Sequence, residues 1–374
     1  MKQFVTDRLI EEDNFCNFQK EKVLLRQHIQ SQAHVVLYGP RNFGKTSLLK
    51  NILIPEFRKT HKKSFVFFAD LMEAKSMDML VSRMKSAFEH SFEESFPVKN
   101  LVQSVKDLLT HIRPIITIDS LTSQPGLSIS LSSTEKNGSI PLIFGLIKDI
   151  SKKIPCLVVI DEFQDIAEIP EAQAFFRAAF QDIHSLPIIL LGSKRQILSE
   201  IFSNPNAPLA FWGQDLEIGP IGYEDYHAYI QERFSQRHLT IRIETASYLQ
   251  DLVHRVPESV NMLCQQLWIT HSEKEITLDD VRVALKAILS SKESRYESYL
   301  SRFSAAEQSV LVQLSRIEKL RHPQSKAFVS ATRLTSRTVG KIINKLYTAG
   351  IIEKEDHSYR ISDPLLAFYL RSYR

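Results

Sequence analysis

Apolar residues cluster in short runs along the first part of the chain, and helical patterns separate these runs. The clearest runs are HVVLYG at 34–39, SFVFFADL at 64–71, CLVVIDE at 156–162 and PIILLGS at 187–193, with QDLEIGPI at 214–221 as a candidate fifth strand. Short, almost wholly apolar strands that alternate with helices are typical of a parallel sheet covered on both faces. We therefore predict a doubly wound, mostly parallel α/β domain over residues 1–221.

Two further segments of this region alternate apolar and polar residues. They are PIITIDS at 114–120 and GLSISLSS at 126–133, and they predict a small β insertion at about 112–134 with one wet face. From Tyr223 the pattern becomes helical, which predicts an α-helical lid domain over residues 222–300. Within it, Thr277 is positioned as an N-cap with Asp280 three residues later.

The last part of the chain has a different order of elements. Three helical patterns, SAAEQSVLVQLSRIEKL, PQSKAFVSATRL and SRTVGKIINKLYTAG, precede IIEKEDHSYRIS, which predicts two short strands joined by a polar turn. Three helices followed by a hairpin is the order of a winged helix-turn-helix. We predict this domain over residues 301–374.

Composition adds limits to this picture. The 374 residues are 43% hydrophobic, enough for a full core and two or three domains. The longest apolar stretches are shorter than the ~20 residues that span a bilayer, and the N-terminus lacks the apolar core of an export signal. We expect a cytoplasmic protein with no membrane partner. Cys16, Cys156 and Cys264 lie far apart, so we expect small core residues rather than disulfides or zinc ligands.

Charge is distributed unevenly along the chain. The net charge is +4, but residues 301–374 carry 13 Lys and Arg against 6 Asp and Glu, which leaves 34 against 37 for the rest. The basic excess therefore belongs to the predicted winged helix. Such an asymmetry indicates a segment with its own partner, and nucleic acid is the first candidate.

The stretch YGPRNFGKTS follows the first strand and precedes a helix, and it fits the phosphate-loop pattern G-x-x-x-x-G-K-[ST]. The predicted nucleotide-binding residues are Gly39, Pro40, Arg41, Asn42, Phe43, Gly44, Lys45, Thr46 and Ser47. Glycines let backbone N–H groups face phosphate oxygens, Lys45 supplies a charge to the β- and γ-phosphates, and Thr46 offers a hydroxyl to Mg²⁺. The following helix adds its positive N-terminal end. The alternative is a plain glycine-bearing turn.

Hydrolysis needs more than a phosphate loop, and LVVIDEFQDI supplies a candidate. Its apolar strand ends in Asp161 and Glu162, at the carboxyl edge where open α/β sheets bind ligands. Asp161 is predicted to hold Mg²⁺ through a water, and Glu162 to polarise the attacking water. Ser193 ends the next strand and is a third catalytic candidate, through contact with the γ-phosphate or that water. The alternatives are that the acids, or Ser193, cap the helices that follow them.

The order of YGPRNFGKTSLL, LVVIDEFQDI, LLGS, a helical lid and a terminal winged helix closing on YRISDPLLAFYL resembles the archaeal-type P-loop ATPases. These are AAA-related proteins of the STAND class. The resemblance spans nearly the whole chain, although only the phosphate loop and the acidic strand end are specific motifs. It implies ATP or ADP as ligand, Mg²⁺ as cofactor, and a lid and winged helix that close over or release the nucleotide domain.

Several positions depart from the family pattern. Asn42 stands where the loop commonly has a second arginine, and Asn17-Phe18 where a glycine-arginine pair lies near the adenine. Gln214 replaces an arginine after Gly213, and Arg255 replaces the glycine of a glycine-x-proline element. A cation that faces developing charge contributes roughly 10³- to 10⁵-fold in rate where it operates. We therefore expect slow turnover, which suits a switch better than a motor.

The third helix of the winged domain carries the candidate nucleic-acid residues Arg333, Arg337, Lys341 and Lys345, which recur every fourth position. The last three stay within one helical face, opposite an apolar face. The functional interpretation is phosphate contact and groove docking on duplex DNA, with few residues suited to base reading. The alternatives are a solvated basic face or a surface that docks on protein.

Three hypotheses follow for function. The first is an ATP-binding, slowly hydrolysing switch whose winged helix contacts DNA or a protein. The second is a DNA-binding regulator in which the nucleotide is structural, and the third is a scaffold whose self-association is gated by nucleotide. The choice between adenine and guanine depends on contacts outside the loop and stays open.

Overall fold

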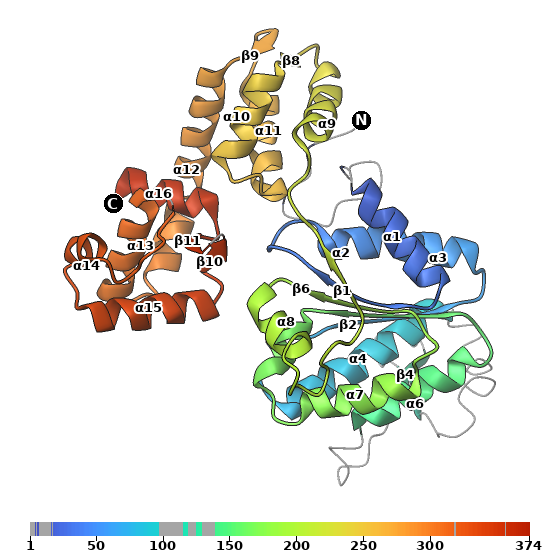
Figure 1. Ribbon diagram of the computed structural model, residues 1–374. Helices are drawn as coiled ribbons and strands as arrows, with labels where there is room; N and C mark the ends of the chain where they lie inside the picture. Colours follow the sequence, from blue (N-terminus) through green and yellow to red (C-terminus); the bar gives the residue numbers. More distant parts are fainter. Residues whose placement is uncertain are drawn as a thin grey trace. The chain divides into compact units, whose positions relative to one another are not determined.

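The computed structural model describes residues 18–96, 115–118, 125–128, 139–317, 319–355 and 357–374, together with Phe4, Thr6 and Cys16 (Figure 1). These residues form two compact units. The N-terminal unit runs from Phe18 to Gly219, and the C-terminal unit runs from Pro220 to Arg374 and includes the three isolated residues. The domain limits expected at 221 and 300 stay predictions.

The N-terminal unit is built on a parallel sheet with the order β2-β5-β6-β1-β7. Its strands are β1 (His34–Tyr38), β2 (Phe65–Asp70), β5 (Cys156–Asp161), β6 (Ile188–Gly192) and β7 (Gln214–Glu217). The central strands β5 and β6 are buried along their whole length. All five predicted strands are therefore confirmed, as is the doubly wound α/β class, because helices cover both faces.

Two sets of helices cover the sheet. Figure 1 shows α1, α2 and α3 over one face and α4, α6 and α7 over the other. In chain order, the helical segments of this unit are α1 (Gln19–Gln30), α2 (Lys45–Leu48), a π-helical segment (Leu49–Leu53), α3 (Ile54–Thr60), α4 (Met77–Ser95), α6 (Ser139–Ser151), a 3₁₀ helix (Phe163–Glu168), α7 (Ala172–Asp182) and α8 (Arg195–Phe202). The π segment lies just before Pro55, whose missing N–H cannot join a regular α-helical ladder.

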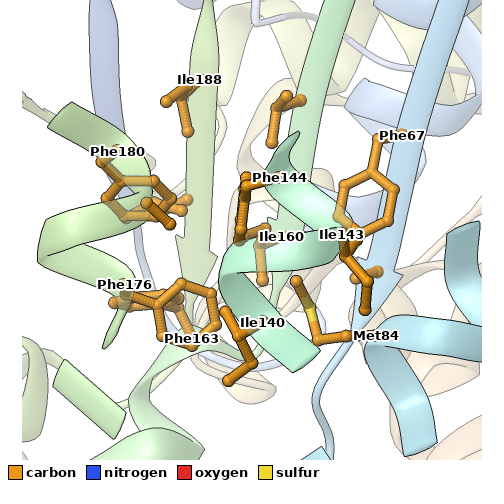
Figure 2. Close-up of a cluster of buried hydrophobic side chains, with 14 of the residues drawn as sticks. Phe67, Met84, Ile140, Ile143, Phe144, Ile160, Phe163, Phe176, Phe180 and Ile188 are labelled. Carbon is orange, nitrogen blue, oxygen red and sulfur yellow. The ribbon is translucent and has the colours of Figure 1, made fainter. Parts of the chain in front are cut away.

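A cluster of aromatic rings under the sheet fixes the turn that follows β5 (Figure 2). Phe163 is fully buried, and its ring lies 5.1 Å from that of Phe176 and 5.7 Å from that of Phe202. Edge-to-face and stacked pairs of this kind stabilise packing beyond their buried area. Because Phe163 directly follows Glu162, this packing sets where the strand ends and where the acidic pair lies.

A short hairpin falls within the predicted β insertion. The strands β3 (Ile115–Ile118) and β4 (Pro125–Ser128) pair in antiparallel fashion. The rest of the interval from 112 to 134 lies outside the described residues.

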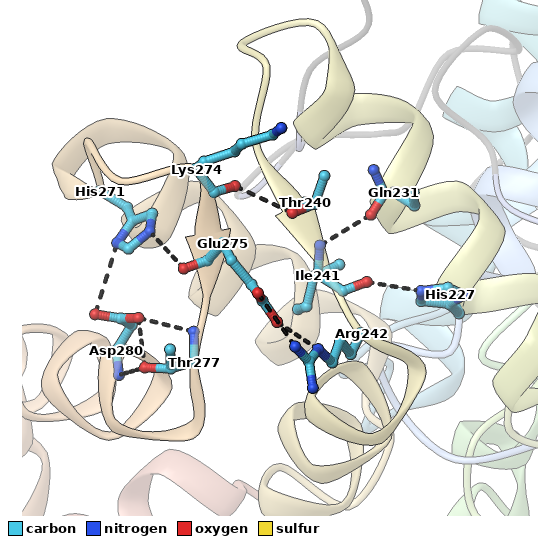
Figure 3. Close-up of polar contacts among 10 residues, drawn as sticks. All are labelled: His227, Gln231, Thr240, Ile241, Arg242, His271, Lys274, Glu275, Thr277 and Asp280. Atoms are coloured by element: carbon cyan, nitrogen blue, oxygen red, sulfur yellow. Dashed lines mark hydrogen bonds and ion pairs between the residues drawn. The ribbon is translucent and has the colours of Figure 1, made fainter.

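Helices dominate the first part of the C-terminal unit, as the sequence predicts. They are α9 (Tyr223–Ser235), α10 (Ile243–Leu252), α11 (Pro257–Thr270) and α12 (Leu278–Leu300), with the short parallel strands β8 (Thr240–Ile241) and β9 (Glu275–Ile276). Figure 3 shows polar contacts around these strands. The Thr277 hydroxyl and Asp280 form a capping box at the start of α12, which confirms the predicted cap. Cys16, expected in the core, is only half-buried, whereas Cys156 and Cys264 are buried.

The second part of the C-terminal unit has the predicted order of three helices and a hairpin. Its elements are α13 (Ala305–Ile317), α14 (Lys326–Thr332), α15 (Ser336–Thr348), β10 (Ile352–Glu355), β11 (Ser358–Ile361) and α16 (Pro364–Tyr373). Val339, Ile342, Ile343 and Leu346 are buried, so α15 packs with the apolar face that the sequence predicts. Among the described helices, none is both long enough and apolar enough to cross a membrane.

Candidate functional site

The phosphate loop lies at the carboxyl end of β1, between strand and helix as expected. Asn42 and Gly44 have left-handed backbone conformations, with φ of 63° and 85°, and α2 begins directly afterwards. Gly39 lies against the end of β7, where an added Cβ would be 2.4 Å from the carbonyl oxygen of Ile218. Only glycine fits at this position, because the opposing atom belongs to the backbone.

Lys45 is the first residue of α2 and is only 6% exposed. Its Nζ donates to the carbonyl oxygens of Gly39 and Pro40, each at 2.8 Å, so one of its three N–H donors has no partner among the described residues. Burial lowers the pKa of Lys45 to about 8, although the charges of Glu162 and Asp161 act in the opposite direction. A lysine this buried, with acidic neighbours and a spare donor, is suited to an anionic ligand.

Thr46 and Asp161 meet across 115 residues of sequence. The Thr46 hydroxyl donates to Asp161 Oδ2 at 2.6 Å, and Asp161 Oδ1 accepts from the backbone N–H of Glu162 at 2.9 Å. Asp161 is 4% exposed, and burial raises its pKa. A hydroxyl and a carboxylate side by side are hard oxygen ligands of the kind that Mg²⁺ prefers, so this pair fits the expected metal.

No cluster of three or more His, Cys, Asp or Glu side chains suited to a metal ion occurs in the described part of the chain. A Mg²⁺ ion held by few protein ligands together with substrate phosphates is the usual arrangement in nucleotide enzymes.

Glu162 is bonded to residues from two segments. Its Oε2 accepts from the Ser193 hydroxyl at 3.0 Å and from the side-chain amide of Gln164. Ser193 therefore turns toward the acidic pair. It does not cap α8, because the N-cap position is Lys194 and no side chain makes a cap bond there. Glu162 likewise makes no cap bond to the 3₁₀ helix that follows it.

The structure also brings in Gln164, a residue that the sequence analysis missed. Its side chain is 2% exposed and contacts both Glu162 and the backbone N–H of Ser193. The available signal was a polar residue two positions after Glu162, between Phe163 and Asp165. That signal is weak, because its partner Ser193 comes from another strand.

The remaining loop residues divide by exposure. Phe43 and Ser47 are buried, at 3% and 8% exposure, whereas Arg41 and Asn42 are exposed. Phe18 is buried beside the loop, 3.7 Å from where a Cβ on Gly44 would lie. Asn17 lies outside the described residues. The structure therefore keeps one arginine, Arg41, exposed at the loop.

The structure describes two of the residues that depart from the family pattern, Arg255 and Gln214. Arg255, where the family has glycine, adopts a left-handed φ of 58°, the conformation in which glycine is favoured. Its guanidinium donates to the Ile221 carbonyl and lies 4.1 Å from the centre of the Tyr223 ring. Gln214 is exposed at the start of β7, just after Gly213 with a φ of 73°.

The basic residues of the winged helix lie at different places. Arg337, Lys341 and Lys345 are exposed on α15, but Arg333 lies before that helix, at the C-cap of α14 with a φ of 56°. Lys345 donates to Glu307 Oε1 at 2.6 Å, so the structure gives it a partner within the domain. Arg337 and Lys341 have no acidic partner among the described residues. The face predicted for DNA therefore holds two available cations on α15.

Comparison with known proteins supports the fold. Residues 294–372 match the family model "Probable winged helix domain". A Walker-type ATPase of Pyrococcus abyssi is 16% identical over 98% of this chain and 99% of its own, with a TM-score of 0.64. The Orc2 protein of Aeropyrum pernix, in its ADPNP and ADP complexes, is 11% identical over 99% and 97%, with a TM-score of 0.53. The Orc1 protein of that organism, in complex with DNA, is 12% identical over 100% and 98%, with a TM-score of 0.52.

These likenesses confirm the predicted fold, a P-loop ATPase domain with helices and a winged helix after it. At such identities they speak to architecture alone. No relative of this sequence was found among curated proteins.

Proposed function

We propose that this chain binds ATP with Mg²⁺, hydrolyses it slowly to ADP and phosphate, and acts as a nucleotide-controlled switch. One observation carries the proposal. The fold brings Lys45 and Thr46 at the start of α2 together with Asp161 and Glu162 at the end of β5. Burying these charges together costs free energy, which is expected where chemistry requires it. ATP is chosen over GTP because the resemblance implies it, and a cytoplasmic location is part of the same proposal.

In the proposed reaction each residue has a separate task. Lys45 and the backbone N–H groups of the loop bind the β- and γ-phosphates. Thr46 and Asp161 hold Mg²⁺, which when bound neutralises charge on the phosphates and aligns them. Glu162 orients the attacking water and accepts its proton as the new bond to phosphorus forms and the bond to ADP breaks. Ser193, bonded to Glu162, helps to keep this carboxylate in place.

We infer slow turnover from arginines that the family pattern has and this chain lacks. Asn42 is exposed on the phosphate loop and uncharged where the pattern has a second arginine, which leaves Arg41 as the arginine of the loop. Asn42 therefore supplies no positive charge to the transferred phosphoryl group. A site that holds its nucleotide well but turns it over slowly lets each nucleotide state persist, as a switch requires.

The test is nucleotide binding and phosphate release by purified variants. Lys45→Ala is expected to weaken ATP binding by at least about 100-fold, because a charge-assisted contact is lost. Glu162→Gln should retain ATP and release phosphate about 100-fold more slowly or worse. Lys50→Ala is a matched control, since this ammonium lies 4.2 Å from the centre of the Phe68 ring and should not affect binding. ATP binding by Lys45→Ala at the wild-type level would rule out the proposal.

We also propose DNA as the partner of the winged helix, ahead of a protein partner or self-association. The supporting observation is that Arg337 and Lys341 are exposed on one face of α15 without acidic partners in the described chain. Exposed cations on the third helix of this motif suit contact with backbone phosphates. A structural relative with this architecture, the Orc1 protein, was solved with DNA bound.

A further inference from the structure

Gln164 is enclosed by polar partners on every side of its amide. Its Nε2 donates to Glu162 Oε2 and, at 3.4 Å, to Asp165 Oδ1. Its Oε1 accepts from the backbone N–H of Ser193 at 3.1 Å. The amide can point only one way, because turning it over would place its NH₂ group against the Ser193 N–H and its oxygen against two carboxylates. A buried amide whose oxygen and NH₂ group both have partners holds its neighbours in a fixed arrangement.

These bonds leave the two oxygens of Glu162 in different situations. Oε2 accepts from Gln164 and from the Ser193 hydroxyl, whereas Oε1 has no hydrogen-bond partner among the described residues. One oxygen is therefore fixed and the other is available. A general base needs this combination, because its carboxylate must be held still while one oxygen receives a proton.

We propose that Gln164 is a positioning residue for hydrolysis, which holds Glu162 through Oε2 so that Oε1 faces the attacking water. The inference rests on the proposed ATPase function and adds to it. Gln164 acts through Glu162 and is not itself expected to touch the nucleotide. Ser193 supplies the second donor to the same oxygen from the end of β6.

The surroundings of Gln164 hold it in place. A Cβ on Gly192 would lie 2.4 Å from Gln164 Oε1, so the strand approaches the amide as closely as glycine allows. On the other side, Asp165 Oδ2 accepts from the backbone N–H of Glu73 at 2.7 Å, which joins the network to the loop after β2. The position of Glu162 thus depends on the ends of three strands, β2, β5 and β6.

The test compares Gln164→Met with wild type, because methionine has a similar volume but no amide. We expect kcat to fall about 10- to 100-fold, as is typical when a group that orients a reactive residue is removed, while ATP affinity changes less than about threefold. Gln173→Met is the matched control. It makes the same change on α7, where Gln173 Oε1 has no hydrogen-bond partner in the described structure, and should leave kcat unchanged.

A double-mutant cycle separates positioning from general disturbance of the site. If Gln164 acts through Glu162, then Gln164→Met should not slow a Glu162→Gln variant further. Gly192→Ala would place a Cβ 2.4 Å from the Gln164 oxygen and 2.7 Å from a methyl group of Leu198. It should displace the amide and lower kcat, which gives a second test if Gln164→Met does not fold. ATP-dependent thermal stabilisation reports folding and binding independently of turnover.

Each outcome decides the matter. Unchanged or raised kcat in a folded Gln164→Met or Gly192→Ala variant overturns the positioning role and leaves the ATPase proposal standing. Equal slowing of wild type and Glu162→Gln by Gln164→Met also overturns it. A wild-type protein that binds ATP but releases no phosphate overturns both proposals together.

Discussion

The proposed nucleotide site and the helix α15 hold their charged residues in opposite environments. Lys45 and Asp161 are 6% and 4% exposed and lie in a network that joins separate strand ends. Arg337 and Lys341 are exposed on a single helix. Burying a charge costs several kcal/mol unless partners compensate for it, whereas an exposed charge costs almost nothing. The buried set is therefore stronger support for a function than the exposed set.

Lys345 lies between these two cases. Its partner Glu307 is 6% exposed and also accepts from the Ser304 N–H and hydroxyl, each at 2.8 Å. The hydrogen bond from Lys345 is the first cause that lowers the pKa of Glu307 to about 2. One cation of α15 thus contributes to the fold of the winged domain. The contrast between buried and exposed charges can therefore also be tested at Lys345 and Glu307.

The largest expected effect comes from crowding the buried site. Gly39→Ala places a Cβ 2.4 Å from a backbone oxygen, so we expect a loss of about 3 kcal/mol in stability and the loss of ATP-dependent thermal stabilisation. Thermal unfolding with and without ATP measures both. Gly145→Ala is the control, because a Cβ there meets no atom within 4 Å and alanine favours the helix α6 by up to about 1 kcal/mol. Normal ATP binding by Gly39→Ala would show that the loop is less constrained than this contact implies.

A smaller effect is expected on the exposed side. Arg337→Ala combined with Lys341→Ala should weaken binding to duplex DNA about 10- to 30-fold near 0.15 M salt and reduce the salt slope by about two. Lys345→Ala alone should change DNA binding much less, because this lysine is paired with Glu307. Titrations at several salt concentrations measure the slope. Equal effects from Lys341→Ala and Lys345→Ala would remove the distinction between free and paired cations on α15.

The smallest effect concerns Glu307. Glu307→Gln should destabilise the winged domain by about 1 kcal/mol at neutral pH, since it weakens a helix cap and removes an ion pair. The folded pKa of about 2 lies below the usual 4.5, so the charged carboxylate stabilises the fold above pH 4.5 and this contribution is lost as pH falls toward 2. The difference between variant and wild type should therefore shrink over that window. A difference that is constant with pH would contradict the assignment.

The parts of the site that sequence predicted are those in contiguous segments. The phosphate loop and the acidic pair each occupy a few adjacent residues whose spacing is set by the turn or strand that carries them. Gln164 could not be predicted, because its role depends on the Ser193 backbone, 29 residues away on another strand. Burial of Cys16 was wrong for a similar reason, since exposure depends on which distant segments cover a residue.

In the winged helix, too, the sequence predicted local features of α15 but not its contacts with distant residues. Periodicity predicted the buried side of α15 correctly, because packing repeats with the helix. It placed Arg333 with the other cations, but the chain turns between Arg333 and the helix start at Ser336. It also gave no sign that Lys345 would meet a buried carboxylate from α13.

The close approach of Ile218 to Gly39 places the residue after β7 directly against the phosphate loop. Ile218 touches Gly39, and its N–H donates to the Tyr38 carbonyl at 2.7 Å. The C-terminal unit begins only two residues later, at Pro220. Along the chain, only Gly219 separates the residue that lines the phosphate loop from the first residue of the C-terminal unit.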